Sequence, residues 1–371
     1  MEPKQPKSDL EQEEAARFRT FRSIIEVANT NNARWAPGLI PLEADREAYL
    51  SLPRRGKKAF TEVWATRYCA ENIVELMLPK IIAAGANVGL DTDLIEALRT
   101  QAVEESLHRT SVARVGHEVI GIKPKNIDKV AKKHNNFAAK QMFARFDEEL
   151  DGLLLSGSKE DIYMAIFVYG CICEDVIANS NVDLMRTYNR YDNFTVPSNK
   201  AADAELALLG VDKPANSPRV VEFPGMKEGQ TIVRKDEGRH VQIAHLATLE
   251  FMREFPDSAP QMLAEMCRRF LDFGDNLLAQ AKASKGIADL ELRNGYGPEV
   301  DSLMYYEVNM RRFANRLKKL GLFDTVDEVQ GRLANARSKY QDEQGVTIIE
   351  DPNIGWRMAG KVALKLAKAK G

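Results

Sequence analysis

Apolar residues recur every three or four positions along most of this chain, which is the spacing of a helix with one buried face. The pattern is clearest over residues 55–84, in the run from Phe60 to Ala84. Almost nothing has the alternating pattern of a strand except VVEF at 220–223. The sequence therefore predicts an all-α fold. We expect further helices over residues 13–29, 92–121, 126–156, 159–180, 231–254, 258–284, 297–320 and 325–340.

Prolines and glycines divide these helices. Gly85 and Gly89 mark the end of the 55–84 helix, and Asp91 is a candidate N-cap for the next one. Residues 33–53 hold three prolines and are expected to be extended. Residues 181–230 hold four prolines with several Asn and Gly, and only one short helical run at 200–209. We therefore predict a loop-rich insertion at about 181–230.

The chain has 371 residues, enough for one large domain with a sizeable core. We expect a disordered polar tail over 1–12, one helical domain over 13–345, and a C-terminal tail over 346–371 that ends in a short basic helix. Charge is balanced at 52 basic and 54 acidic residues, so no nucleic-acid partner is expected. No apolar run is long enough to span a membrane. Without a signal peptide or a disulfide framework among the four cysteines, the expected location is the cytoplasm.

Two short motifs carry the candidate chemistry. Glu105 and His108 form one ExxH motif, and Glu237 and His240 form a second. Residues three apart on a helix point to one side, so each motif places a carboxylate beside an imidazole. The chain has only five histidines, and two of them lie in these motifs. Two such pairs on facing helices supply four of the six ligands of the di-iron or di-manganese carboxylate site of a ferritin-like bundle.

The two further carboxylates that such a site needs are Glu71, before the first motif, and Glu174, between the two. Glu174 lies in the otherwise apolar stretch AIFVYGCICEDVIA, where a lone carboxylate is costly to bury unless it is paired or bound to metal. Glu75 is an alternative to Glu71, one turn later. Glu104 neighbours Glu105, but the spacing to His108 selects Glu105.

Asp236 immediately precedes the second motif. A metal-bound histidine usually donates its other ring nitrogen to a carboxylate, and Asp236 could accept that hydrogen bond from His108 across the bundle. The alternative for Asp236 is an ordinary surface position.

These residues resemble the ribonucleotide reductase small-subunit superfamily of ferritin-like proteins, over about 33–113, 160–180 and 231–250. The phrases ARWAPGLIPLEADREAYLSL, AENIVE, EESLHRTS and RKDEGRH carry the resemblance. It implies a ferritin-like four-helix bundle with additional helices, two metal ions per chain and a homodimer. It also implies that Trp35 pairs with Asp236. The metal ligands that it implies are Glu71, Glu105, His108, Glu174, Glu237 and His240.

The chain departs from the reductase subunit in two places. The family's radical tyrosine lies one turn after the first ExxH histidine, where this chain has Val112. The reductase also ends in a tail with a relay tyrosine, whereas the last tyrosine here is Tyr340 and the tail is basic and aliphatic. Both differences argue against radical transfer to a large catalytic subunit.

A closer resemblance is to the small-subunit-like ligand-binding oxidases. That branch holds an Mn/Fe or di-iron centre, binds a long-chain fatty acid and forms an ether cross-link between a valine and a tyrosine, which correspond here to Val74 and Tyr169. Both could instead be plain core residues. The 63-residue span from Glu174 to Glu237 is longer than a compact bundle requires. A second branch, the di-iron N-oxygenases of amines, has an extra histidine ligand where this chain has Val233.

The resemblance implies an O2-activating di-metal oxidase or oxygenase acting on a small organic or fatty-acid-like substrate. The ligands do not distinguish Fe/Fe from Mn/Fe. A ferredoxin or flavin reductase is the expected electron donor, and the 181–230 insertion is a candidate lid. The apolar pocket is expected to be lined by Val74, Val112, Ile166 and Tyr169. The alternatives are a radical-generating small subunit, an N-oxygenase, and a non-catalytic bundle that stores metal.

Overall fold

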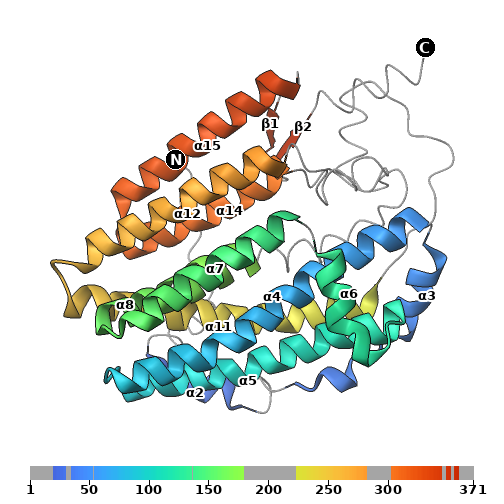
Figure 1. Cartoon of the computed structure of the whole chain (residues 1–371), viewed down its shortest axis with the longest axis horizontal. Helices are drawn as coiled ribbons and strands as arrows, with labels where there is room; N and C mark the ends of the chain where they lie inside the picture. Colours follow the sequence, from blue (N-terminus) through green and yellow to red (C-terminus); the bar gives the residue numbers. More distant parts are fainter. Residues whose placement is uncertain are drawn as a thin grey trace, which may run out of the picture.

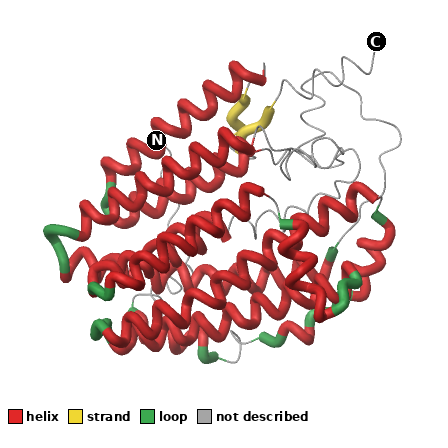
Figure 2. Tube along the Cα trace, in the orientation of Figure 1, coloured by secondary structure: helices red, strands yellow, loops and turns green. Residues whose placement is uncertain are grey.

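The computed structural model describes residues 20–30, 35–52, 54–135, 137–178, 223–281, 302–344, 348–351 and 355–358. Nearly all of these residues are helical, as Figure 2 shows. Four segments form the central bundle. They are α4 (Arg54–Asn87), α5 (Thr92–Arg114), α8 (Lys159–Ile166) with its π-helical continuation η4 (Phe167–Ala178), and α11 (Pro224–Glu254).

The four segments of this bundle pack against one another. Helix α4 packs along α5, and α11 packs on both η4 and α5 (Figure 1). Helices α12 (Ala259–Ala281), α14 (Ser302–Leu320) and α15 (Phe323–Gln344) lie together beside the bundle. The remaining helices are α2 (Phe21–Ala28), η1 (Pro37–Leu39), α3 (Glu43–Ser51), η2 (Val115–Ile120), η3 (Pro124–Asn126), α6 (Ile127–His134) and α7 (Phe137–Ser156).

The turn between α4 and α5 follows the sequence signals closely. Gly89 has a φ of 70°, a left-handed conformation that glycine adopts without steric cost. The Asp91 side chain accepts hydrogen bonds from the backbone N–H groups of Asp93 and Leu94, which caps α5. Gly85 does not end the helix as predicted, because α4 continues through Asn87. This turn sets α4 and α5 antiparallel.

Helix α11 begins earlier than the sequence pattern predicts. The insertion was expected to reach residue 230, but residues 224–230 form the first turns of α11. The cap comes from a distant segment: the buried Asp45 carboxylate accepts hydrogen bonds from Gly225 N and Met226 N, both at 2.8 Å. Pro224 at the first helical position needs no partner for its nitrogen. Asp45 itself lies on α3, within a stretch expected to be extended.

Two other segments differ from the prediction. The expected helix 126–156 is interrupted at Asn135, which leaves the helical conformation and accepts a hydrogen bond from Thr66 Oγ1 at 3.2 Å. Residues 348–358, expected to be tail or helix, contain the antiparallel strands β1 (Ile348–Asp351) and β2 (Gly355–Met358). The tails 1–12 and 359–371, the 200–209 helical run and most of the VVEF segment lie outside the described residues.

The interior of the bundle is apolar except at one level near its centre. Helices α4, α5, α8 and α11 bury Leu78, Leu94, Ile166 and Phe251 at or near zero exposure. The same helices bury charged residues at one level, which is the candidate site. Among the described residues, no helix is both long and apolar enough to cross a membrane.

Candidate metal centre

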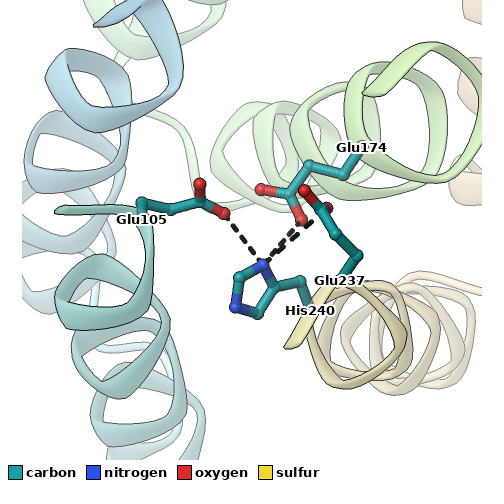
Figure 3. Close-up of side chains that lie close together, drawn as sticks. All are labelled: Glu105, Glu174, Glu237 and His240. Carbon is teal, nitrogen blue, oxygen red and sulfur yellow. Dashed lines mark ion pairs between the residues drawn. The ribbon is translucent and has the colours of Figure 1, made fainter. Parts of the chain in front are cut away.

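The six predicted ligands converge at the centre of the bundle. Each is at most 2% exposed. Figure 3 shows four of them, Glu105, Glu174, Glu237 and His240, turned toward one another from three helical segments. Helix α4 contributes Glu71, α5 contributes Glu105 and His108, η4 contributes Glu174, and α11 contributes Glu237 and His240.

The side chains form two overlapping groups of potential ligands. One group is Glu105, Glu174, Glu237 and His240, and the other is Glu71, His108 and Glu237. Within each group, one ligand atom from every residue lies within 4.8 Å of the others. Glu237 belongs to both groups, so its two oxygens could bridge a pair of metal ions. This is the arrangement expected of a di-metal carboxylate site.

Both histidines turn Nδ1 toward the carboxylates. His240 Nδ1 lies 2.8 Å from Glu105 Oε1 and 3.5 Å from Glu174 Oε2. His108 Nδ1 lies 3.2 Å from Glu105 Oε2 and 3.9 Å from Glu237 Oε1. Each ring therefore offers the same nitrogen to the centre of the site.

The opposite nitrogens bind two further carboxylates. His108 Nε2 donates to Asp236 Oδ2 at 3.1 Å, and His240 Nε2 donates to Glu104 Oε2 at 2.8 Å. Trp35 Nε1 donates to the same Asp236 oxygen at 2.9 Å. Arg239 forms ion pairs with both Glu104 and Asp236. Such outer hydrogen bonds fix the tautomer and orientation of a ligating imidazole.

The structure separates the predicted glutamates from their sequence neighbours. Glu75, the rival of Glu71, points away from the cluster and pairs with Arg109 Nη1 at 2.8 Å. Glu104, the neighbour of Glu105, faces the outer nitrogen of His240. Only Glu71 and Glu105 of these four carboxylates join the two groups of potential ligands.

A cation and an amide also contact the cluster. Arg67, on α4, is 2% exposed and forms ion pairs with Glu71 and with Glu237 Oε1, the latter at 3.1 Å. Gln101 Nε2 donates to both oxygens of Glu174, at 2.8 and 2.9 Å. Hydrogen bonds of this kind hold carboxylates in fixed orientations.

Burial dominates the electrostatics of this site. It raises the pKa of Glu71 to about 7 and that of Glu174 to about 8. Burial also favours a raised pKa for Glu105, but the positive charges of His108 and His240 outweigh it and lower that pKa well below its usual value. Four carboxylates held this closely need compensating positive charge.

The donor set fits two metal ions. The buried Glu237 Oε2 has no hydrogen-bond partner, and Glu105 Oε1 faces His240 Nδ1 at 2.8 Å without the geometry of a hydrogen bond. Buried polar atoms normally make hydrogen bonds, so carboxylate oxygens and an imidazole nitrogen gathered here without them suit a bound cation. Carboxylate oxygens with imidazole nitrogens suit iron and manganese.

The space beside the carboxylates is small. A cavity of about 10 Å³, near the size that holds one water molecule, is bounded by the carboxylates, Arg67 and the apolar side chains of Val74 and Phe143. Of the four residues expected to line a substrate pocket, only Val74 borders it. Tyr169 is buried, and its pKa is raised well above the usual value by burial and by the charge of Glu174. Val112 packs with Trp64, whose Nε1 donates to the Val112 carbonyl oxygen at 2.8 Å.

Four residues of the site were not identified as such from the sequence: Arg67, Gln101, Glu104 and Arg239. The signals were weak. Glu104 and Arg239 lie beside the predicted ligands in the motifs, and Arg67 and Gln101 lie one turn before Glu71 and Glu105. The four-residue spacing places Arg67 and Gln101 on the same helix face as those ligands.

Comparison with known proteins identifies the fold. No protein-family model matches the chain, and no curated protein sequence does. An R2-like ligand-binding oxidase with aerobically reconstituted metal cofactor after photoconversion matches at 19% identity and a TM-score of 0.59, over 81% of this chain and 93% of that chain. Two mutants of the R2-like ligand-binding oxidase with anaerobically reconstituted Mn/Fe cofactor match at 19% identity over 81% of this chain. Their TM-scores are 0.59 and 0.57, and 92% and 93% of their chains are covered.

At this level of identity the likeness is one of fold. The described chain has the all-α, ferritin-like fold of the R2-like ligand-binding oxidases. The predicted all-α, ferritin-like fold is therefore confirmed, apart from the two short strands β1 and β2.

Proposed function

We propose that this protein is a di-metal oxidoreductase that uses O2, with two metal ions held by Glu71, Glu105, His108, Glu174, Glu237 and His240. One observation carries the proposal. Four glutamates and two histidines, all buried, meet in two overlapping groups of potential ligands that share Glu237. The fold that this chain shares with Mn/Fe oxidases supports it.

The contacts of the site suggest a role for the metal ions and for each surrounding side chain. Bound iron or manganese supplies the electron transfer that O2 reduction requires. Asp236 and Glu104 hold the two imidazoles with Nδ1 inward, and Gln101 orients Glu174. Ala70, Val74 and Phe143 form the apolar border of the cavity. Trp35 is partly exposed and bonded to Asp236, which makes it the candidate point of electron entry.

The proposed substrate class rests on the apolar residues that border this cavity. The residues beside the carboxylates are apolar apart from Arg67, which suits a small organic or fatty-acid-like molecule. An oxygenase reaction adds one oxygen atom of O2 to the substrate and forms one water, with two electrons and two protons from a donor. Because the cavity holds about one water molecule, we expect side chains to move when a substrate binds.

Val74 and Tyr169 are proposed to react with each other. An ether bond from Tyr169 Oη to the Val74 Cβ would replace one O–H and one C–H bond, and O2 would accept the two hydrogens with their electrons. Peptide mass spectrometry before and after exposure to air tests this step. A linked peptide pair lighter by two hydrogen atoms supports the cross-link, and two separate unmodified peptides exclude it.

Metal content is the first test of the proposed function. The protein is loaded without oxygen with equal Fe(II) and Mn(II), desalted and analysed for both elements. We expect about two ions per chain, as such bundles bind, and a loss of metal in the variants Glu105→Ala and His240→Ala. Glu75→Ala is the matched control, since this α4 glutamate pairs with Arg109 outside the cluster. Well below one ion per folded chain would overturn the proposal.

Oxygen uptake tests the reaction class. The loaded protein should consume O2 faster than the same concentration of free metal, and Glu105→Ala should abolish the excess. A protein that holds two ions but never exceeds free metal would instead be a storage or structural bundle. The Mn:Fe ratio in the loaded sample distinguishes a mixed-metal centre from a di-iron centre.

A further inference from the structure

Arg67 is the unusual member of the cluster because it places a positive charge where a metal ion is expected. Its guanidinium is buried, and it forms ion pairs with Glu71 and with Glu237 Oε1. Both carboxylates belong to the ligand group that contains His108. Burying an arginine costs free energy in desolvation, which its carboxylate partners offset.

In the other ligand group, which contains His240, Glu174 is held by a neutral side chain rather than by a cation. Glu174 accepts two hydrogen bonds from Gln101, a neutral amide. His240 Nδ1 faces Glu105 and Glu174 at 2.8 and 3.5 Å, and its Nε2 is held by Glu104. A cation entering this group meets oriented carboxylates and an inward imidazole nitrogen. It does not have to separate the ion pair between Arg67 and Glu71.

We propose that Arg67 is a resident cation that makes the two metal positions unequal. The position formed by Glu105, Glu174, Glu237 and His240 fills first, and the position formed by Glu71, His108 and Glu237 fills second and more weakly. The inference rests on the proposed metal-binding function and adds the order in which the site is assembled.

The physical reason is repulsion between cations at short range. A metal ion held by Glu71 and Glu237 would share both of these carboxylates with the Arg67 guanidinium, whereas an ion in the other position would share only Glu237. At such a separation, like charges repel strongly even at a high effective dielectric constant. A difference between the two dissociation constants of about tenfold or more is therefore expected. If Arg67 were only a counter-ion for surplus negative charge, its removal would leave the difference between the two dissociation constants unchanged.

The order of filling can be measured on the intact protein with Mn(II) alone. Metal-free protein is titrated without oxygen, and the free Mn(II) is read from its electron paramagnetic resonance signal. We expect two separate binding phases of one ion each. Glu71→Gln should remove the weak phase and keep the tight one, whereas Glu174→Gln should remove the tight phase.

Variants of Arg67 test the cause. Arg67→Met should tighten the second phase about tenfold and merge the two, and Arg67→Lys, which keeps the charge, should retain two phases. Arg109→Met is the control, because this α5 arginine pairs with Glu75 of α4 away from the cluster. If Arg67→Met does not fold without metal, the comparison of Glu71→Gln with Glu174→Gln still decides the order.

The outcomes separate this inference from the proposed function. Two ions bound in one phase, or a tight phase lost in Glu71→Gln and kept in Glu174→Gln, would overturn the role of Arg67 and leave the metal site standing. Two phases that persist unchanged in Arg67→Met would also overturn it. Failure to bind Mn(II) or Fe(II) in any phase would count against the proposed function itself.

Discussion

His240 donates from Nε2 to Glu104 at 2.8 Å while its Nδ1 faces Glu105 at 2.8 Å. Two adjacent glutamates thus contact opposite edges of one imidazole. His108 repeats the relationship with Asp236, and Arg239 joins the two outer carboxylates. The two halves of the site are therefore connected behind the histidines as well as through Glu237.

This relationship predicts a measurable role for Glu104. Glu104→Ala should lower metal affinity by roughly 10–100-fold, the usual effect of removing the outer partner of a ligating histidine. The reason is that His240 loses the acceptor that fixes its tautomer. Mn(II) binding by the folded variant measures the effect. Glu96→Ala, on the exposed face of the same helix, is the control. Equal affinity in both variants would mean that Glu104 has only a structural role.

The start of α11 gives a prediction about stability. Asp45 is fully buried and accepts two backbone hydrogen bonds at the helix N-terminus. Asp45→Ala leaves two buried N–H groups without a partner and should lower the free energy of unfolding by about 1–3 kcal/mol. Asp45→Asn keeps an acceptor oxygen and should cost less. Denaturant unfolding measures both, and a larger loss in the asparagine variant would contradict the capping role.

Much of the fold and the two ExxH pairs could be predicted because each rests on local periodicity, whereas the choice of Glu71 over Glu75 came from the family resemblance. The helices around Glu71, Glu105, Glu174 and Glu237 each have a continuous apolar face, and the ExxH spacing fixes which side chains share that face. Asp91 could be recognised as a cap because its partners lie two and three residues away.

The features that were missed depend on contacts between distant segments. Asp45 caps α11 from 180 residues away, so nothing near Pro224 signals the early start. Asn135 breaks a helix through a bond to Thr66 on α4. Arg67 reads as an ordinary helix residue until folding places Glu237 beside it. Sequence spacing cannot show contacts of this kind.

The metal-free protein should lose stability as the pH rises from about 6.5 to 8. Burial raises the pKa of Glu71 to about 7 and of Glu174 to about 8, and those of His108 and His240 are raised by Glu105 despite their burial. The folded state therefore holds protons that the unfolded chain has released, so stability is greatest on the acid side of this window and falls as the pH rises through the raised values.

Bound metal should remove most of that dependence, because it replaces the protons on the glutamates. Thermal unfolding of the metal-free and loaded protein between pH 6.5 and 8 measures the difference. Glu174→Gln should make the metal-free profile less steep, since the amide does not titrate while Glu71, His108 and His240 still do. A metal-free protein that became more stable with rising pH would contradict the assignment of the raised pKa values.

Gly170 sets the distance between the two helical segments that carry Glu174 and His240. A Cβ at this position would lie 2.3 Å from the Ala244 Cβ and 3.9 Å from the carbonyl oxygen of His240. Gly170→Ala must therefore push η4 away from α11, which we expect to cost about 1–3 kcal/mol of stability, as overpacking of a core does. The shift would also widen the gap between Glu174 and His240, so Mn(II) affinity should fall in the folded variant. Gly152→Ala, in α7 with nothing within 4 Å of the added Cβ, should instead stabilise the protein by roughly 0.5–1 kcal/mol. Equal effects of the two substitutions on Mn(II) affinity would show that the close approach at Gly170 does not control the metal site.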